Sequence, residues 1–375
     1  MKEKVRFLGL DVHAETIAVA VAEPDGSVRS LGTIANRAES IRKLMKKLGP
    51  VEQLRACYEA GPTGYVLYWQ LAELGVKCEV IAPTLVPVQA GNRVKTDRRD
   101  AQKLARSYRS EDLTAVWVPD EGTEALRDLV RARESAKQDQ LRARHRLGKF
   151  LLRTGQRPGH GVKAWTQDYM TWVRQLRFEQ MAQEATRQDY LHEVEHMGER
   201  VKRLEQAIAE AVKVASPALQ EVVRDLQALR GIAHISAVTI ASELGNISRF
   251  EGARQLMGYS GAVPSEDSSG ERVRRGRITK TGNAHLRRIA IEAAWSYKFR
   301  PAVGPALRKR QEGLPEEVKE IAWKAQHRLH KRFSRLSAAG KDRRKVVTAV
   351  GRELLGFIWA IGIKAEAAAR QRLAA

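Results

Sequence analysis

The chain has 375 residues, which is enough for two or more domains with hydrophobic cores of their own. Its 66 Lys and Arg outnumber its 44 Asp and Glu and give a net charge of +22, while a hydrophobic content of 43% excludes a disordered polycation. This charge favours a polyanionic partner such as nucleic acid, the alternative being a merely basic protein. No apolar run approaches the roughly 18 residues of a membrane span, and the first residues lack a secretory segment, so a cytoplasmic protein without membrane contact is expected.

The N-terminal third alternates between apolar strands and amphipathic helices. Its patterns predict strands over residues 6–13, 16–22, 28–34, 54–59 and 76–81, helices over 36–48, 65–74 and 97–108, and a loop over 82–95. The order of three strands, helix, strand, helix and strand is that of a ribonuclease H-like α/β domain, which we place at residues 1–115.

Carboxylates stand at four particular places of this predicted domain. Asp11 lies within the first strand, where an ionised side chain is costly unless it is paired or bound to a metal, and Glu59 ends the fourth strand. Asp97 and Asp100 share one face of the following helix, although two acids after Thr96 also fit simple helix capping. In a ribonuclease H-like sheet the four positions converge. Such hard oxygen ligands select Mg²⁺ or Mn²⁺, and two such ions about 4 Å apart cleave phosphodiesters.

The middle of the chain, residues 116–216, is predicted to be helical. One helix is expected from residue 121 to 153, and a long helix or helix pair from about 165 to 214. Apolar residues recur near heptad spacing from Val194 to Val212, so an antiparallel coiled coil is expected, with a dimer contact along the same stripe as the alternative.

Residues 226–244 resemble a helix-hairpin-helix, whose turn offers backbone N–H groups to a DNA phosphate. Ala233 stands where that motif has its second glycine, so a plain helix–turn–helix packing unit is the alternative.

A glycine-punctuated basic stretch follows at residues 258–288 and is expected to be largely loop. Nine basic residues stand against two acidic ones between residues 271 and 300, and Ser268-Ser269-Gly270 directly precedes the arginine cluster. A serine needs activation to attack a phosphodiester, and arginines that position and polarise the phosphate would assist it. On the residues alone, a flexible phosphate-gripping loop with merely polar serines accounts better for the pattern. The candidate nucleic-acid contacts are Arg272, Arg274, Arg275, Arg277, Lys280, Arg287 and Arg288.

The C-terminal region, residues 306–375, is predicted to be helical from Pro315 to Gln371 with an interruption at residues 338–340. Residues 324–345 carry nine basic side chains and one acidic side chain, which favours phosphate binding over a solvated face. Residues 346–363 are apolar enough to pack back onto the body of the protein.

Several landmarks, taken in order, resemble the DEDD-type transposases of the IS-one-ten insertion-sequence family. They are GLDVH at residues 9–13, YEAGPTGY at 58–65, KTDRRDAQKLA at 95–105, LGNISRF at 244–250, GYSGAVP at 258–264, SSG at 268–270 and ITKTGNAHLRR at 278–288. Each motif is short, but their order and spacing over most of the chain are specific.

The resemblance implies a fold of class α/β plus all-α: a RuvC-like N-terminal mixed sheet, the central helices, and a mostly helical transposase domain at residues 217–305. It implies that the four carboxylates bind the metal ions. It also implies that Ser269, with Ser268 as the alternative register, attacks a DNA phosphodiester and forms a phosphoserine link.

The resemblance further implies a homo-oligomer that acts on the DNA of its element ends and target, guided by a structured RNA from the same element. Two rival functions remain open on the sequence. One is a resolvase-like nuclease that uses the same carboxylates with water. The other is a non-enzymatic nucleic-acid-binding protein.

Overall fold

The computed structural model describes residues 5–87, 96–270 and 272–374, and the chain divides into two compact units, Met1–Val118 and Pro119–Ala375. The finer division into 1–115, 116–216, 217–305 and 306–375 stays a prediction. Of the loop predicted at 82–95, residues 88–95 lie outside the described residues. The part before them contains a 3₁₀ turn, Pro83–Leu85.

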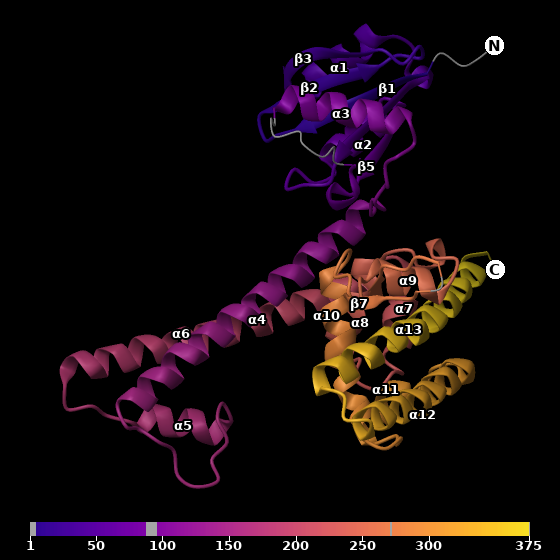
Figure 1. Cartoon of the computed structure of the whole chain (residues 1–375). Helices are drawn as coiled ribbons and strands as arrows, with labels where there is room; N and C mark the ends of the chain where they lie inside the picture. The colour runs from indigo at the N-terminus through magenta and orange to yellow at the C-terminus, as the bar shows by residue number, and fades with distance from the viewer. Residues whose placement is uncertain (1–4, 88–95, 271, 375) are drawn as a thin grey trace. The chain divides into compact units, whose positions relative to one another are not determined.

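The first unit is built on a five-stranded mixed sheet (Figure 1). Its strands are β1 (Arg6–Val12), β2 (Thr16–Ala22), β3 (Val28–Ala35), β4 (Leu54–Glu59) and β5 (Lys77–Ile81), and its helices are α1 (Ala38–Leu48), α2 (Val66–Glu73) and α3 (Asp97–Arg109). The strand order is β3-β2-β1-β4-β5. Short turns make β1, β2 and β3 antiparallel neighbours, whereas helical crossovers return β4 and β5 parallel to β1. The predicted strands and helices of this unit are confirmed, with ends that differ by one or two residues.

The alternation of residues along β2 explains how helices cover both faces of the sheet. The odd-numbered positions from Ile17 to Val21 are large and pack with α1 and α2 on one face. The even-numbered positions from Ala18 to Ala22 are alanines and pack with Ala101 and Ala105 of α3 on the other. The small side chains let α3 lie close to the sheet.

Gly9 of β1 allows α3 to rest directly on the strand backbone. A Cβ atom at this position would lie 2.2 Å from the carbonyl oxygen of Ala101 and 2.3 Å from the backbone nitrogen of Ala105. No side chain can occupy that space unless the helix moves away. Gly9 and Asp11 are two residues apart on one strand and therefore face the same helix.

We expect Gly9→Ala to destabilise the first unit by about 3 kcal/mol, because the methyl group forces α3 off the sheet. Urea unfolding monitored by circular dichroism measures the change. Gly61→Ala is the matched control, since the nearest atom to a Cβ there is 3.9 Å away. Equal unfolding midpoints for the two variants would contradict the close packing of α3 on β1.

The second unit is almost entirely helical (Figure 1). Its helices are α4 (Glu121–Arg153), α5 (Gln167–Gln175), α6 (Met181–Lys213), α7 (Pro217–Leu226), α8 (His234–Leu244), α9 (Ala253–Tyr259), α10 (Ala284–Ala294), α11 (Pro305–Gln311), α12 (Glu316–Ala338) and α13 (Arg343–Ala374). Between them lie the 3₁₀ turns η3 (Ile247–Arg249) and η4 (Trp295–Lys298) and the strands β6 (Pro264–Glu266) and β7 (Arg275–Ile278). The prediction of a mostly helical C-terminal region is confirmed.

Helices α4 and α6, each of 33 residues, form a long antiparallel pair (Figure 1). Arg133 near the start of α4 pairs with Glu205 near the end of α6, and Arg146 further along α4 pairs with Glu193 nearer the start of α6. The second predicted helical segment is therefore a helix pair, α5 and α6. Supercoiling of α4 around α6 stays a prediction.

Helix α13 is the central helix of the C-terminal bundle, and its apolar residues join one core with α7, α8, α10 and α12. Among the described residues it is the one helix long and apolar enough to cross a membrane, with a mean hydropathy of 1.6 over 18 residues, half of them buried. The expectation that no apolar run approaches membrane length is therefore wrong. The run instead packs onto the body, as expected for residues 346–363.

The turn between α7 and α8 is packed against other parts of the bundle. Gly231 has a φ of +84°, and a Cβ atom there would lie 2.5 Å from the carbonyl oxygen of Ala293 on α10. The guanidinium of Arg230 donates to the carbonyl oxygen of Arg300 over 2.8 Å. These contacts favour the packing-unit alternative for this segment, and a DNA-phosphate role stays untested.

Candidate active site

The sheet register places two of the predicted carboxylates side by side. The last pair of the parallel β1–β4 ladder joins Leu10 to Tyr58, so Asp11 and Glu59 follow at adjacent strand ends. Leu10 and Tyr58 belong to the core under α1 and α2, and alternation turns the next residues toward α3. The hydroxyl of Tyr58 donates to the carbonyl of Gly64 over 3.0 Å and holds the turn that follows Glu59.

Helix α3 carries the other two carboxylates on the side that faces the sheet. Asp97 and Asp100 lie one turn before Ala101 and Leu104, which are buried against the strands. The side-chain oxygen of Thr96 accepts a hydrogen bond from the backbone N–H of Arg99 and caps the helix. Thr96 therefore supplies the cap of this helix, which leaves the side chains of Asp97 and Asp100 available for the predicted site.

His13 joins Asp11 and Asp97 in a compact group. Its Nε2 lies 3.5 Å from Oδ2 of Asp11 and 3.6 Å from Oδ2 of Asp97. Ligand atoms of the three residues all lie within 4.8 Å of one another, and across the described residues this is the group of His, Cys, Asp or Glu with spacing suited to a metal ion. Asp11 is partly buried, and the other two are exposed. Glu59 and Asp100 are not part of this group.

The donor set fits a divalent cation. Two carboxylates supply hard oxygen ligands suited to Mg²⁺ or Mn²⁺, and the imidazole nitrogen is a ligand that transition metals accept more readily than Mg²⁺. His13 was not among the site residues predicted from the sequence. The signal was present in GLDVH, because residues 11 and 13 of an extended strand point to the same side.

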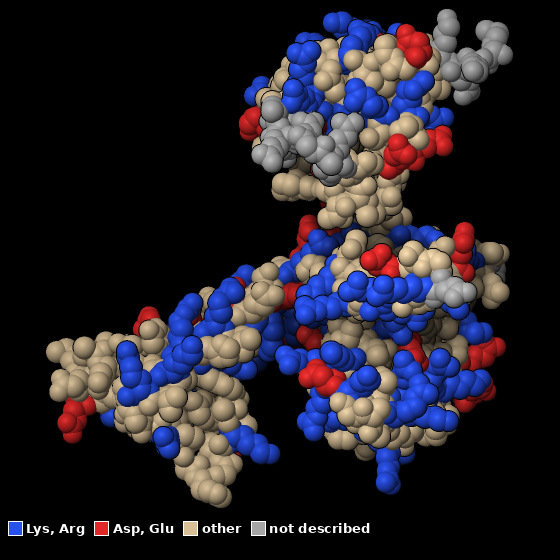
Figure 2. Space-filling view, in the orientation of Figure 1, with Lys and Arg blue, Asp and Glu red and all other residues tan. Residues whose placement is uncertain are grey.

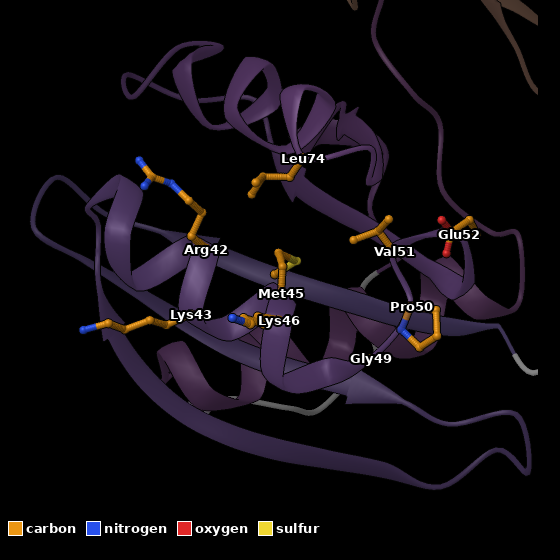
Figure 3. A pocket seen from close by; sticks show the side chains of 9 residues that line it. All are labelled: Arg42, Lys43, Met45, Lys46, Gly49, Pro50, Val51, Glu52 and Leu74. Carbon is orange, nitrogen blue, oxygen red and sulfur yellow. The ribbon is translucent and has the colours of Figure 1, made fainter.

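A cleft of about 560 Å³ lies on the other face of this sheet (Figure 3). Its lining consists of Arg42, Lys43, Met45 and Lys46 of α1, residues 49–52, and Leu74. Because α1 and α2 cover the face opposite α3, this cleft is separate from the group around Asp11.

In the second unit, β6 and β7 pair as a short antiparallel hairpin, and Ser268-Ser269-Gly270 lies in the connection between them, so the stretch expected to be largely loop contains these two short strands. The backbones of Ser269 and Arg272 exchange two hydrogen bonds of 3.2 Å, which places Ser269 in the exposed connection at the end of the hairpin. The hydroxyl of Ser268 donates to Glu266 over 3.0 Å and accepts from the backbone N–H of Arg274 over 3.2 Å. Ser268 thus stabilises the hairpin, while Ser269 stands at its end.

The seven predicted nucleic-acid contacts do not have equal surroundings. Figure 2 shows Lys and Arg side chains gathered on the surface of the second unit. Arg287 donates to the carbonyl oxygen of Ser260 over 2.6 Å, and Arg288 pairs with Glu134 of α4 over 2.7 Å. These two residues therefore support the fold. The exposed members of the set are Arg272, Arg274, Arg275, Arg277 and Lys280.

A buried polar network anchors the start of α10. Glu243 of α8 is fully buried and accepts hydrogen bonds from Arg131 (2.8 and 3.0 Å) and from Nδ2 of Asn283 (2.7 Å). Asn283 also caps α10 by accepting from the backbone N–H of Leu286. Burial alone would raise the pKa of Glu243, but the hydrogen bonds from Arg131 and Asn283 outweigh it and hold this pKa below its ordinary value.

We expect Asn283→Asp to destabilise the second unit by about 3 kcal/mol at pH 7, because it removes a donor and sets a second carboxylate beside buried Glu243. Asn283→Ser, which keeps a capping oxygen without the charge, should cost only about 1–2 kcal/mol.

The pH dependence of stability distinguishes repulsion between the two carboxylates from the simple loss of a hydrogen bond. In the natural protein the lowered pKa of Glu243 gives stability that is present above pH 4.5 and is lost as the pH falls through the folded value. The Asp variant should instead gain stability between pH 7 and 5, as its carboxylate pair takes up a proton. Thermal unfolding at both pH values tests this, and equal losses for the Asp and Ser variants at pH 7 would contradict it.

Two family models match the chain. One, for DEDD transposases, is described as "Transposase" and matches residues 8–155, and the other is described as "Transposase IS116/IS110/IS902 family" and matches residues 223–308. The group around Asp11 lies within the first match, and the hairpin that bears Ser269 lies within the second.

Three similar proteins cover much of the chain. The protein y4qE of Sinorhizobium fredii, named as a transposase, is 45% identical over 362 residues, which is 96% of this chain and 89% of that protein. The transposase for insertion sequence element IS1533 of Leptospira borgpetersenii is 34% identical over 345 residues, 91% of this chain and 99% of that protein. The protein y4rJ of S. fredii, also named as a transposase, is 27% identical over 288 residues, 70% of each chain.

Proposed function

Because this chain belongs to the IS116/IS110/IS902 family of insertion-sequence transposases, we propose that it cuts and rejoins DNA at the ends of its own element through a serine nucleophile assisted by divalent cations. The enzyme is a DNA transposase. The meeting of Asp11 and Asp97 around His13 is the observation that carries the cation-assisted part of the proposal.

Asp11 and Asp97 hold Mg²⁺ or Mn²⁺ in this proposal, with Glu59 and Asp100 beside them. The cation, when bound, supplies charge that polarises the scissile phosphate. Strand β1 and helix α3 keep the two carboxylates in place through the packing at Gly9. His13, whose Nε2 lies 3.5 Å from Oδ2 of Asp11 and 3.6 Å from Oδ2 of Asp97, would add a nitrogen ligand to the two carboxylates.

Ser269 is the proposed nucleophile, since its hydroxyl stands at the hairpin end while that of Ser268 is used in hairpin hydrogen bonds. Its Oγ forms a bond to the phosphorus, and the bond from phosphorus to one deoxyribose oxygen breaks. The serine proton passes to solvent, and the released deoxyribose oxygen takes up a proton from solvent to become a hydroxyl. Arg272 and Arg274 would bind the phosphate oxygens. The covalent link retains the phosphodiester energy, so rejoining requires no ATP.

The partners in this proposal are DNA from the element ends and the target, together with a structured RNA encoded by the element. The net charge of +22 supports binding of large polyanions such as DNA and RNA. In this proposal the protein acts in the cytoplasm as a homo-oligomer. Ser269 and the carboxylates of one reaction centre can then come from different subunits.

A trapping assay tests the function. The protein, with and without co-expressed RNA, is incubated with labelled DNA that spans an element end and with Mg²⁺, and is then denatured. A protein–DNA adduct supports the serine mechanism. Cleaved DNA without an adduct would indicate a nuclease that uses water, and adduct formation without the RNA would refute guidance by RNA.

A further inference from the structure

A patch of exposed aromatic side chains lies on the bundle of the second unit. In the part of the chain that the structure describes, the Trp and Phe residues with exposed side chains are Trp295 (39%), Phe299 (56%) and Trp323 (43%). All three come from two segments, η4 with the residue after it and α12. The chain has seven Trp and seven Phe, so this concentration of the exposed ones calls for a binding explanation.

Hydrogen bonds hold the two segments against each other. Oε1 of Gln326 on α12 accepts from the backbone N–H of Ala302 over 3.1 Å, and Nδ1 of His330 lies 3.1 Å from the carbonyl oxygen of Tyr297. Trp323 is one turn before Gln326 and follows the same side of α12. Its ring contacts that of His327, with centroids 4.6 Å apart at 76°. The segments that carry Trp323 and Phe299 therefore adjoin.

Two cationic side chains lie beside the ring of Phe299. The Nζ of Lys298 lies 4.8 Å from the centroid of its ring, and the guanidinium carbon of Arg230 lies 5.9 Å from it. Neither cation forms an ion pair with a carboxylate within the described ranges, and the same holds for Arg300. Surfaces that stack nucleobases and bind the adjoining phosphates combine aromatic rings with positive charges that no carboxylate neutralises.

We propose that this patch binds single-stranded DNA, with unpaired bases stacked on Phe299 and Trp323 and phosphates bound by Lys298 and Arg300. The positive charge favours a polyanion over a protein partner, and a transposase that exchanges strands must handle unpaired DNA. The proposal rests on DNA as the substrate of the enzyme, but it is independent of Ser269 and of the carboxylates.

Fluorescence anisotropy tests the proposal on the full-length protein. The probes are a labelled 12-nucleotide oligo(dT), an abasic strand of the same length, a 12-base-pair duplex and oligo(U). We expect Phe299→Ala and Trp323→Ala each to weaken oligo(dT) binding on the order of tenfold, and to leave binding of the abasic strand unchanged. Lys298→Gln should weaken both strands and reduce the salt dependence.

Matched controls separate stacking from loss of structure. Leu152→Ala removes a side chain of α4 that is 64% exposed and should leave every affinity unchanged. Trp323→Phe keeps an aromatic face and should retain most of the oligo(dT) affinity, and circular dichroism verifies folding.

Three outcomes would overturn the proposal: equal losses on the abasic strand or the duplex, no loss on oligo(dT), or a ring-dependent preference for oligo(U), which would make the patch an RNA site. Cleavage and rejoining by Ser269→Ala and Asp11→Asn are measured separately in the trapping assay. If these two variants still cleaved and rejoined DNA, the serine and carboxylate proposal would fail while the patch stood.

Discussion

Asp11→Asn is expected to abolish strand cleavage while the protein still folds and binds DNA. The substitution keeps the size of the side chain on β1 but removes the negative charge that meets Asp97 and His13. Without that charge the site holds a divalent cation weakly, and the charge that develops on the phosphate is no longer stabilised. We expect the cleavage rate to fall by at least about 10²-fold.

Cleavage of a labelled element end in Mg²⁺ measures this effect, and thermal unfolding with and without Mn²⁺ provides a second readout. A cation that binds only the folded state raises the melting temperature of the natural protein, and this rise should disappear in Asp11→Asn.

The matched control is Glu73→Gln, which removes an exposed carboxylate from α2, on the other face of the sheet. It should retain both cleavage and the response to Mn²⁺. If Asp11→Asn cleaved DNA at the natural rate, the carboxylate group would have no part in the chemistry, whatever its geometry.

Ser269→Ala should remove the covalent protein–DNA adduct completely. The reason is that the neighbouring hydroxyl of Ser268 is engaged by Glu266 and by the backbone of Arg274 and is not free to replace that of Ser269. Denaturing gel electrophoresis of the trapping reaction measures the adduct directly. DNA binding should be unchanged, because the substitution removes one uncharged hydroxyl.

Ser268→Ala is the informative control for this prediction. It deletes two hydrogen bonds of the hairpin, worth about 1 kcal/mol each, and should lower the yield of adduct without abolishing it. The reverse pattern, in which Ser268→Ala loses the adduct and Ser269→Ala keeps it, would show that the nucleophile is one residue earlier. An adduct in both variants would refute Ser269 as the sole nucleophile.

The local pattern of apolar and polar residues was sufficient to predict most of the secondary structure. The alternation from Thr16 to Ala22 is that of a strand with two differently covered faces, and α4 begins and ends at the predicted residues 121 and 153. These features depend on side chains within a few positions of one another, so periodicity and capping signals report them. The hairpin of β6 and β7 could not be predicted from local pattern, because its pairing depends on contacts across the turn, such as that between Ser268 and Arg274.

What the sequence by itself determined is the order of the elements, the family resemblance and the positions of the four carboxylates on their strands and helix. Only the tertiary structure decided which of them meet: packing of α3 on Gly9 brings Asp97 to Asp11 and adds His13 to the group. It also decided that Arg288 faces Glu134 of a distant helix, although in the sequence it resembles the exposed arginines before it. The physical reason is that these outcomes depend on contacts between residues far apart in the chain, whose distances no local periodicity records.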